Sequence, residues 1–278
     1  MTFNNKVYNV TEIQPRAFAG TDIDILRLPA NIKAIPDEMA ADCPSLISVG
    51  LPDHLETIGA KAFYGSPNIR YIRCYNFGTD NSLGPPSFTN TDESDYGEAF
   101  STEIWPECML VIPANMYGNY KKATGWKKFR TFAYWHDYDV DPNTVEFTGQ
   151  HEYTPGSSIT LTPATTPDNA TILNFVIKTD NPSIASFSAG KDADNKTALI
   201  VNTLAEGEAQ VTVYANLVKT TFKLTVSNVS GIDDMTADDS HEARYFNLQG
   251  IEIKNPAPGT VCMKITGTRV EKIVYTAD

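Results

Sequence analysis

One apolar pattern recurs in the first third of the sequence at a constant spacing of 23 residues. A period of this length is typical of stacked units, each made of a short strand and a return segment that cannot bury its apolar face alone. Stacking such units buries one continuous core and places their strands side by side. The three copies of the pattern are Ile23-x-x-Leu26-x-Leu28, Leu46-x-x-Val49-x-Leu51 and Ile69-x-x-Ile72-x-Cys74.

The repeat pattern changes after Tyr75. Residues 76–107 are polar and rich in Gly, Pro, Asp and Ser, which predicts one long loop, and long loops often carry function. The run Leu110-Val-Ile112-Pro113 then restores the pattern of a strand followed by proline. Residues 117–129 contain Tyr, Trp and Phe, and we interpret them as the atypical last unit that closes a stack. We therefore expect a repeat domain at residues 1–135, with about three full units.

The remainder of the chain has the pattern of short β-strands. We expect a linker at 136–143 and then alternating strands separated by turn residues at 144–227, which predicts a β-sandwich of immunoglobulin type. Further short strands at 228–278 predict a small C-terminal β meander. The predicted fold class is mainly β, with α+β character in the repeats.

Charge and composition exclude several classes of function. The formal net charge of −12 disfavours nucleic acid and anionic membranes as partners, because the surface repels phosphate groups. No apolar stretch approaches the roughly 20 residues that span a bilayer, so we expect a protein that is not membrane-spanning. With 41% hydrophobic and 20% charged residues, the chain has the composition of a folded protein.

The common sequence signatures of catalysis are missing. There is no G-x-S-x-G turn, no phosphate-binding G-x-x-x-x-G-K-[ST] loop and no H-E-x-x-H helix. The four histidines are scattered in turn-like contexts and are better explained as solvated loop residues than as catalytic bases. We therefore expect no enzymatic activity and no cofactor.

The four cysteines are too few for a disulfide framework in a chain of 278 residues, and no C-x-x-C pair suggests zinc. Cys74 and Cys262 occupy apolar patterns and are expected to be small buried hydrophobic residues. The spacing leaves open a Cys74–Cys108 disulfide across the last repeat.

A run of alternating carboxylates, Asp137, Asp139 and Asp141, resembles the start of a calcium-binding EF-hand loop. It departs from that loop at the sixth position, where Pro142 replaces glycine, and at the twelfth, where Thr148 replaces glutamate. An irregular Ca²⁺ site remains a weak alternative. A solvated acidic linker explains the run better, so we expect no metal.

The strand pattern also predicts candidate binding residues. Side chains alternate along a strand, so the residues between the core positions point away from the core. Aromatic and arginine side chains are enriched at binding hot spots, and Arg73→Glu is expected to abolish binding without loss of stability. The alternative is ordinary surface decoration, or contact with the 76–107 loop. The candidates are Ile25, Arg27, Ser48, Tyr71 and Arg73.

Three resemblances cover most of the chain. Residues 1–135 resemble the BspA-type leucine-rich repeats of bacterial cell-surface proteins, through the phrase Ile-x-x-x-Ala-Phe at 13–18 and 58–63 and the ending Gly125-Trp-Lys-Lys-Phe129. The middle is similar to bacterial Ig-like group 2 domains, through residues 162–167 and 179–185. The tail, with Tyr245-Phe-Asn-Leu-Gln-Gly250, resembles C-terminal modules of secreted proteins, some of which act as sorting signals.

These resemblances imply a cell-surface or secreted protein, although the first residues lack the basic and apolar segments of a signal peptide and by themselves predict a cytoplasmic location. The implied function is adhesion to, or recognition of, a protein or glycan ligand on a host or neighbouring cell. The repeats would bind, and the Ig-like domain would be a spacer. The alternatives are a carbohydrate-binding accessory module of a surface glycan-processing system and a structural component of a surface layer.

Overall fold

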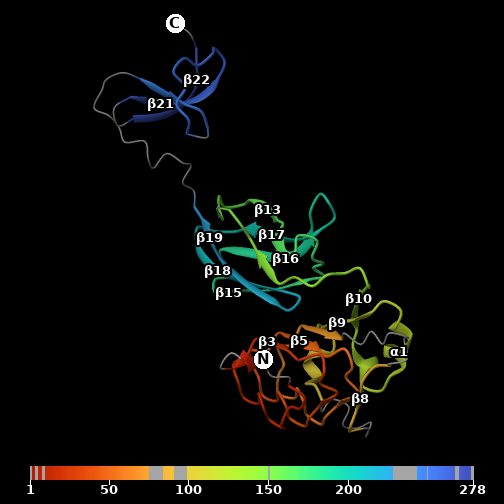
Figure 1. The fold of residues 1–278 in the computed structure, drawn as a ribbon. Coiled ribbons are helices and arrows are strands. Elements are labelled where there is room, and N and C mark those ends of the chain that lie inside the picture. The colour runs from red at the N-terminus through yellow and green to blue at the C-terminus, as the bar shows by residue number, and fades with distance from the viewer. Residues whose placement is uncertain are drawn as a thin grey trace.

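The computed structural model shows a chain that is mainly β, with very little helix (Figure 1). Within the described residues no helix has the length and hydrophobicity needed to cross a membrane. Two short strands, β1 (Thr2–Phe3) and β2 (Lys6–Val7), pair near the N-terminus. The structure describes residues 2–3, 6–7, 10–74, 84–90, 99–149, 151–227, 243–248, 250–266 and 269–276.

A five-stranded parallel sheet forms the N-terminal unit, which we define as the described part of residues 10–135. Three of its five strands pair with the offset of 23 seen in the sequence, so that Leu26 lies opposite Val49 and Val49 opposite Ile72. The strands, in spatial order, are β10 (Thr131–Trp135), β9 (Met109–Pro113), β7 (Tyr71–Cys74), β5 (Ser48–Leu51) and β3 (Ile25–Arg27).

The return segments of the N-terminal unit form a second parallel sheet. It contains β4 (Ala34–Ile35), β6 (Thr57–Ile58) and β8 (Ser87–Phe88). The buried rows of the two sheets face one another and share one apolar core. This core is what holds such short strands together, because a strand of two to five residues buries too little surface to be stable alone.

A fourth repeat lies within the segment that the sequence suggested was one long loop. β8 pairs with β6, and Phe100 forms a parallel bridge with Phe63, so residues 84–90 and 99–107 rejoin the rows of the stack. The loop prediction is wrong for these residues, and its remaining parts, 76–83 and 91–98, lie outside the described residues. Ala99-Phe100 repeats Ala62-Phe63, but insertions change the spacing and hide the repeat.

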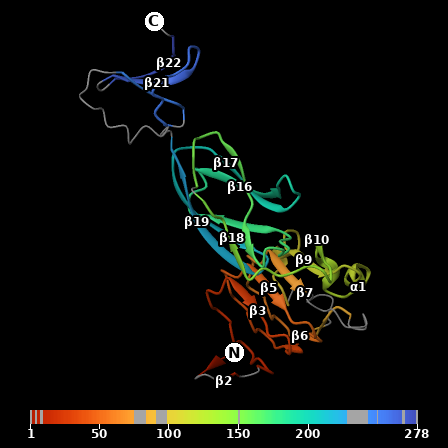
Figure 2. The same cartoon turned by 45° about the horizontal axis from the view of Figure 1, so that its top comes forward.

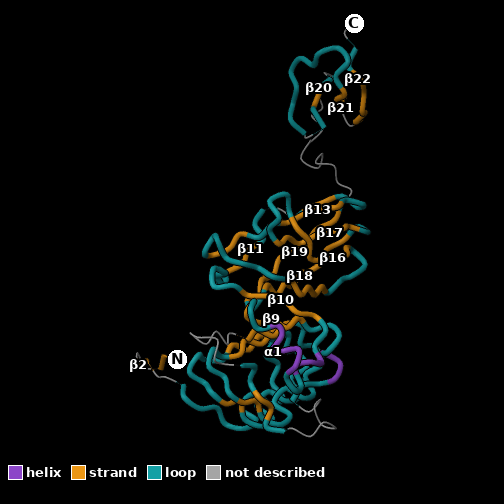
Figure 3. The backbone as a smooth tube through the Cα atoms, turned by 90° about the vertical axis from the view of Figure 1, so that its right-hand side faces the viewer, coloured by secondary structure: helices purple, strands orange, loops and turns teal. Residues whose placement is uncertain are grey.

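Aromatic side chains close the core at the C-terminal end of the stack. Trp126 and Phe129 are fully buried around Phe100, and the Trp126 indole donates a hydrogen bond of 2.7 Å to the carbonyl of Pro86. Figure 3 shows the helical segments gathered here, beside β9 and β10. They are η2 (Thr102–Ile104), α1 (Tyr117–Lys122) and η3 (Trp126–Lys128).

The middle unit, residues 144–227, contains two larger sheets that share one apolar core. Val211 and Leu224 come from one sheet and Leu199 and Val201 from the other, and all four are fully buried. The first sheet has the order β12 (Glu152–Tyr153), β19 (Val218–Val226), β18 (Gly207–Ala215), β15 (Phe175–Thr179). The second has the order β13 (Ser158–Leu161), β17 (Thr197–Thr203), β16 (Ala185–Lys191), and β11 (Thr144–Glu146) pairs separately with β14 (Ala164–Thr166).

A small antiparallel sheet ends the chain, with the order β20 (Arg244–Phe246), β21 (Val261–Thr266), β22 (Arg269–Val274). Phe246, Cys262 and Ile265 are its buried residues. Figure 2 shows where one end of the β18–β19 hairpin meets the parallel sheet of the N-terminal unit. That contact determines how much of the outer face of the parallel sheet is open to a partner.

Candidate functional site

The outer face of the parallel sheet, which carries the binding residues expected from the sequence, is covered by the middle unit. Tyr71, Val111 and Trp135 of the sheet form a buried apolar cluster with Leu217, at the tip of the β18–β19 hairpin. Leu173, from the segment before β15, packs against the same cluster. The face is therefore an internal contact surface between two parts of one chain.

The expectation that the candidate residues are open to solvent is wrong for three of them. The exposed fraction is 0% for Ser48, 1% for Tyr71 and 2% for Arg73, whereas Ile25 is half-buried and Arg27 is exposed. Their direction, away from the core of the stack, follows the expected alternation. A role in binding a partner stays a prediction, and it would require this contact between the units to open.

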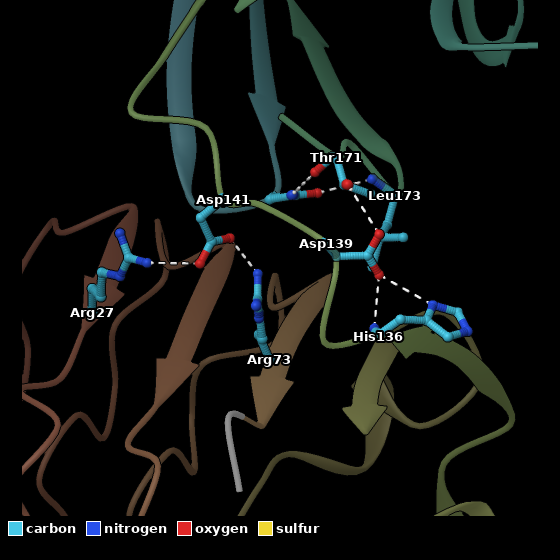
Figure 4. Close-up of polar contacts among 8 residues, drawn as sticks. Arg27, Arg73, His136, Asp139, Asp141, Thr171 and Leu173 are labelled. Atoms are coloured by element: carbon cyan, nitrogen blue, oxygen red, sulfur yellow. Dashed lines mark hydrogen bonds and ion pairs between the residues drawn. The ribbon is translucent and has the colours of Figure 1, made fainter. Parts of the chain in front are cut away.

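A carboxylate from the segment that joins the two units holds the two arginines of the face (Figure 4). Asp141 accepts a hydrogen bond from Arg73 through one oxygen and one of 3.0 Å from Arg27 through the other. The Arg73 guanidinium also lies over the Trp135 ring, 3.2 Å from its centroid. Buried charge is tolerated when it is paired and hydrogen-bonded, so Asp141 and Trp135 explain how Arg73 can be buried.

A second polar contact joins the units at the other side of the face. Asp24, just before β3, accepts hydrogen bonds from the Lys219 ammonium and from the Tyr214 hydroxyl, the latter at 3.1 Å. Burial alone would raise the pKa of Asp24, but the hydrogen bond and charge of Lys219, with the Tyr214 hydroxyl, hold it below the ordinary value. Burial and the nearby Asp24 charge raise the pKa of Tyr214 to about 12.

The joining segment, residues 136–143, is fixed to the middle unit. One oxygen of Asp139 accepts a hydrogen bond of 2.7 Å from the His136 backbone amide, and the other accepts one of 3.0 Å from the Thr171 hydroxyl (Figure 4). The Thr171 amide donates to the carbonyl of Val140 at 2.7 Å. The interpretation of this run as a solvated linker is therefore wrong for Asp139 and Asp141, because specific donors hold both carboxylates.

The three carboxylates proposed as a weak Ca²⁺ site do not converge. Asp141 faces the arginines of the sheet, and Asp139 faces His136 and Thr171 (Figure 4). Asp137 is exposed on the turn between His136 and Asp139. Across the described ranges, no group of three or more His, Cys, Asp or Glu residues has the arrangement needed to hold a metal ion.

All four cysteines are free thiols and buried. The register places Tyr71 opposite Met109, so Cys74 lies level with Ile112 rather than with Cys108. Burial raises the pKa of Cys74 to about 12, which keeps it protonated as a small apolar side chain at neutral pH.

A hollow of about 520 Å³ opens on the side of the middle unit. It is bordered by the β16–β17 hairpin and by residues 162–172, and its charged lining residues are Asp168, Lys191 and Lys196. Within it the Lys191 ammonium donates a hydrogen bond of 3.1 Å to the Thr197 hydroxyl, and that hydroxyl donates one of 2.6 Å to the carbonyl of Ile172.

A group of side chains that the sequence reasoning missed lies at the C-terminal end of the stack. Phe132 and Tyr134 of β10 continue the two inward rows, and Tyr117 of α1 contacts both, with ring centroids 5.3 and 6.0 Å away. The Lys121 ammonium lies 4.7 Å from the Phe132 centroid. We call Tyr117, Lys121, Phe132 and Tyr134 the end cluster. Phe132 and Tyr134 are two residues apart on β10, and this spacing could have indicated the group. The sequence analysis instead interpreted the aromatic residues before them as a closed cap.

Comparison with known proteins gives a family match for the first third of the chain. Residues 1–93 match the BspA type leucine rich repeat region, in six copies. No curated protein matches the sequence significantly.

Two solved structures show a slight likeness, and both are of the S-layer protein SbsC. Its domains 4 and 5 are 19% identical with a TM-score of 0.26, covering 35% of this chain and 56% of that one. Its domains 1–6 are 12% identical with a TM-score of 0.26, covering 52% and 27%. The chain thus spans less than two thirds of either structure, and the likeness is too low to support an argument. What the comparisons establish is a BspA-type leucine-rich repeat region over residues 1–93.

Proposed function

We propose that this chain is a non-enzymatic bacterial protein of the cell surface or of secretion, which recognises a protein or glycan partner through its N-terminal unit. The observation that carries the proposal is the match of residues 1–93 to BspA-type repeats, together with the parallel strand row that extends it to residue 135. Repeat stacks of this kind offer extended surfaces for binding rather than deep pockets for chemistry.

The proposed organisation has three domains: a leucine-rich repeat solenoid at 1–135, an Ig-like sandwich at 144–227 and a C-terminal β module at 228–278. The absence of strands shared between their sheets, within the described residues, supports this division. In this organisation the Ig-like domain is a rigid support as well as a spacer, because it covers the outer strand face. Recognition therefore uses a surface of the repeats other than that face.

The test is binding of the intact protein to an array of host-matrix proteins and glycans. Its matched control is Ile72→Asp, which places an unpaired charge at a fully buried position of the N-terminal unit and should unfold that unit. Circular dichroism and thermal unfolding would establish which parts of each variant are folded. We expect binding by the wild type and loss of binding by Ile72→Asp. An array without any bound target, or undiminished binding by an unfolded N-terminal unit, would contradict the proposal.

A further inference from the structure

The segment that ends the repeat stack has an unusual charge for this protein. Residues 108–136 contain five basic residues and neither aspartate nor glutamate, while the whole chain has a net charge of −12. The rest of the chain therefore carries −17, so residues 108–136 are a basic region of an otherwise strongly acidic sequence. The five residues are Lys121, Lys122, Lys127, Lys128 and Arg130.

The end cluster brings exposed aromatic rings into this basic region. Tyr117 is 42% exposed and Tyr134 is 40% exposed, although both extend an otherwise buried stack. Tyr117 is nearly perpendicular to both of its neighbours, at 87° to Phe132 and 79° to Tyr134. Such edge-to-face contacts hold the rings in fixed positions, so a ligand meets a preformed surface and little side-chain entropy is lost on binding.

A cation is built into the same surface. The Lys121 ammonium lies 4.7 Å from the Phe132 ring centroid and 5.8 Å from that of Tyr117. A cation at this distance from ring faces is attracted by their negative electrostatic potential, which keeps it beside the rings. The end cluster thus combines apolar ring surface, phenolic hydroxyl groups and a positive charge within one small area.

From this combination we infer that the end cluster binds an acidic polysaccharide, meaning a chain of sugar rings that carries carboxylate or sulfate groups. The C–H faces of a sugar ring are apolar and weakly positive, and they complement the negative faces of tyrosine rings. The acidic groups would meet the ammonium of Lys121. The inference rests on the proposed recognition function and names its surface and ligand class.

Charge density favours a polysaccharide over nucleic acid. Double-stranded DNA carries about one negative charge per 1.7 Å, so a long stretch of it would meet the acidic remainder of this protein. Electrostatic repulsion extends over roughly 8–10 Å at moderate salt, so acidic groups at that distance still repel the phosphates. A glycan with at most one charge per sugar places fewer charges outside the basic region.

The test uses polygalacturonate as the acidic polysaccharide, neutral dextran, polyglutamate and a single-stranded oligonucleotide, with binding measured by calorimetry on the full chain. The variants are Tyr134→Ala and Lys121→Gln. Their matched controls are Tyr64→Ala, at a 47% exposed tyrosine elsewhere on the N-terminal unit, and Lys61→Gln, at an exposed lysine of the same unit. Thermal unfolding of each variant establishes that it is folded.

We expect wild-type binding to polygalacturonate that weakens with salt, a loss of about tenfold or more in each end-cluster variant, and no change in the controls. Weak binding to dextran and polyglutamate would show that binding needs both the sugar rings, which meet the tyrosines, and the acidic groups, which meet Lys121. Equal binding of polyglutamate or oligonucleotide, or unchanged affinity in folded Tyr134→Ala and Lys121→Gln, would overturn the inference. If the intact protein binds array targets but no acidic glycan, this site assignment fails while the proposed recognition function stands.

Discussion

Arg73 shows how a single residue determines the role of the strand face. Placing a guanidinium at 2% exposure is costly unless its charge is paired and its hydrogen bonds are made. Here the charge meets Asp141 and the flat guanidinium group stacks on Trp135. Lysine could not reproduce this arrangement, because its ammonium is a compact point charge without a planar face.

Arg73→Glu is expected to destabilise the protein by about 3–5 kcal/mol, because it buries a carboxylate against Asp141 and removes the stack on Trp135. Urea denaturation measures the change in the free energy of unfolding. The matched control is Arg27→Glu, since the Arg27 side chain is 50% exposed and its pairing with Asp141 is worth roughly 1 kcal/mol or less. Wild-type stability in Arg73→Glu, which the sequence alone suggested, would contradict the buried position.

At the scale of elements, the stack depends on close contacts between its last segments. Gly125 separates α1 from η3, has a φ of +76°, and lies so that an added Cβ would be 2.4 Å from a ring carbon of Phe88. Phe88 belongs to β8 and packs against Trp126 with 5.2 Å between ring centroids. The turn at Gly125 therefore packs closely against Phe88 of the fourth repeat.

Gly125→Ala should therefore destabilise the protein by roughly 1–3 kcal/mol, through a strained backbone and overpacking against Phe88. The control is Gly118→Ala, inside α1, where an added Cβ meets nothing within 4 Å. That change should leave stability unchanged or raise it by up to about 1 kcal/mol, because alanine favours helix. Differential scanning calorimetry of both variants checks the prediction, and similar melting temperatures for the two would contradict it.

The sequence predicted the elements where periodicity was intact and failed where it was interrupted. Alternation and the offset of 23 correctly placed Leu26, Val49 and Ile72 in one inward row. The fourth repeat was missed because insertions separate Phe63 from Phe100 by 37 positions rather than 23. The covering of the strand face was also missed, because the contact of Asp24 with Lys219 joins residues 195 positions apart, and no local pattern encodes it.

At the scale of the whole molecule, the N-terminal and middle units are joined by an apolar cluster with a polar contact on each side. Leu217 contributes to the cluster, Asp141 holds one side and Asp24 the other. Apolar contacts supply most of the stabilisation in such an arrangement, and the charged pairs fix its geometry. The pairs also make the junction sensitive to pH.

Asp24→Asn should reduce stability by about 1 kcal/mol or less at neutral pH, because Lys219 is partly exposed and water weakens the pair. The folded pKa of Asp24 is lowered from 3.8, so its contribution is complete above that value and is lost as the pH falls through the lowered pKa. Urea denaturation from pH 7 to pH 2.5 should show the wild type and variant converging at the acid end. The control is Asp22→Asn, at an exposed residue nearby. A difference that grew with acidity would contradict the assignment.

The joining segment limits which parts of such a protein can be exchanged during evolution. Asp141 serves the arginines of the parallel sheet, while Asp139, two residues before it, accepts from Thr171 of the following region. The eight residues of the joining segment therefore make specific contacts with both the N-terminal unit and the middle unit. Exchanging either neighbour for a homologous module would leave the segment matched to only one of them. The N-terminal and middle units are thus expected to be inherited as a pair, and a working chimera must be cut after residue 227 rather than between them.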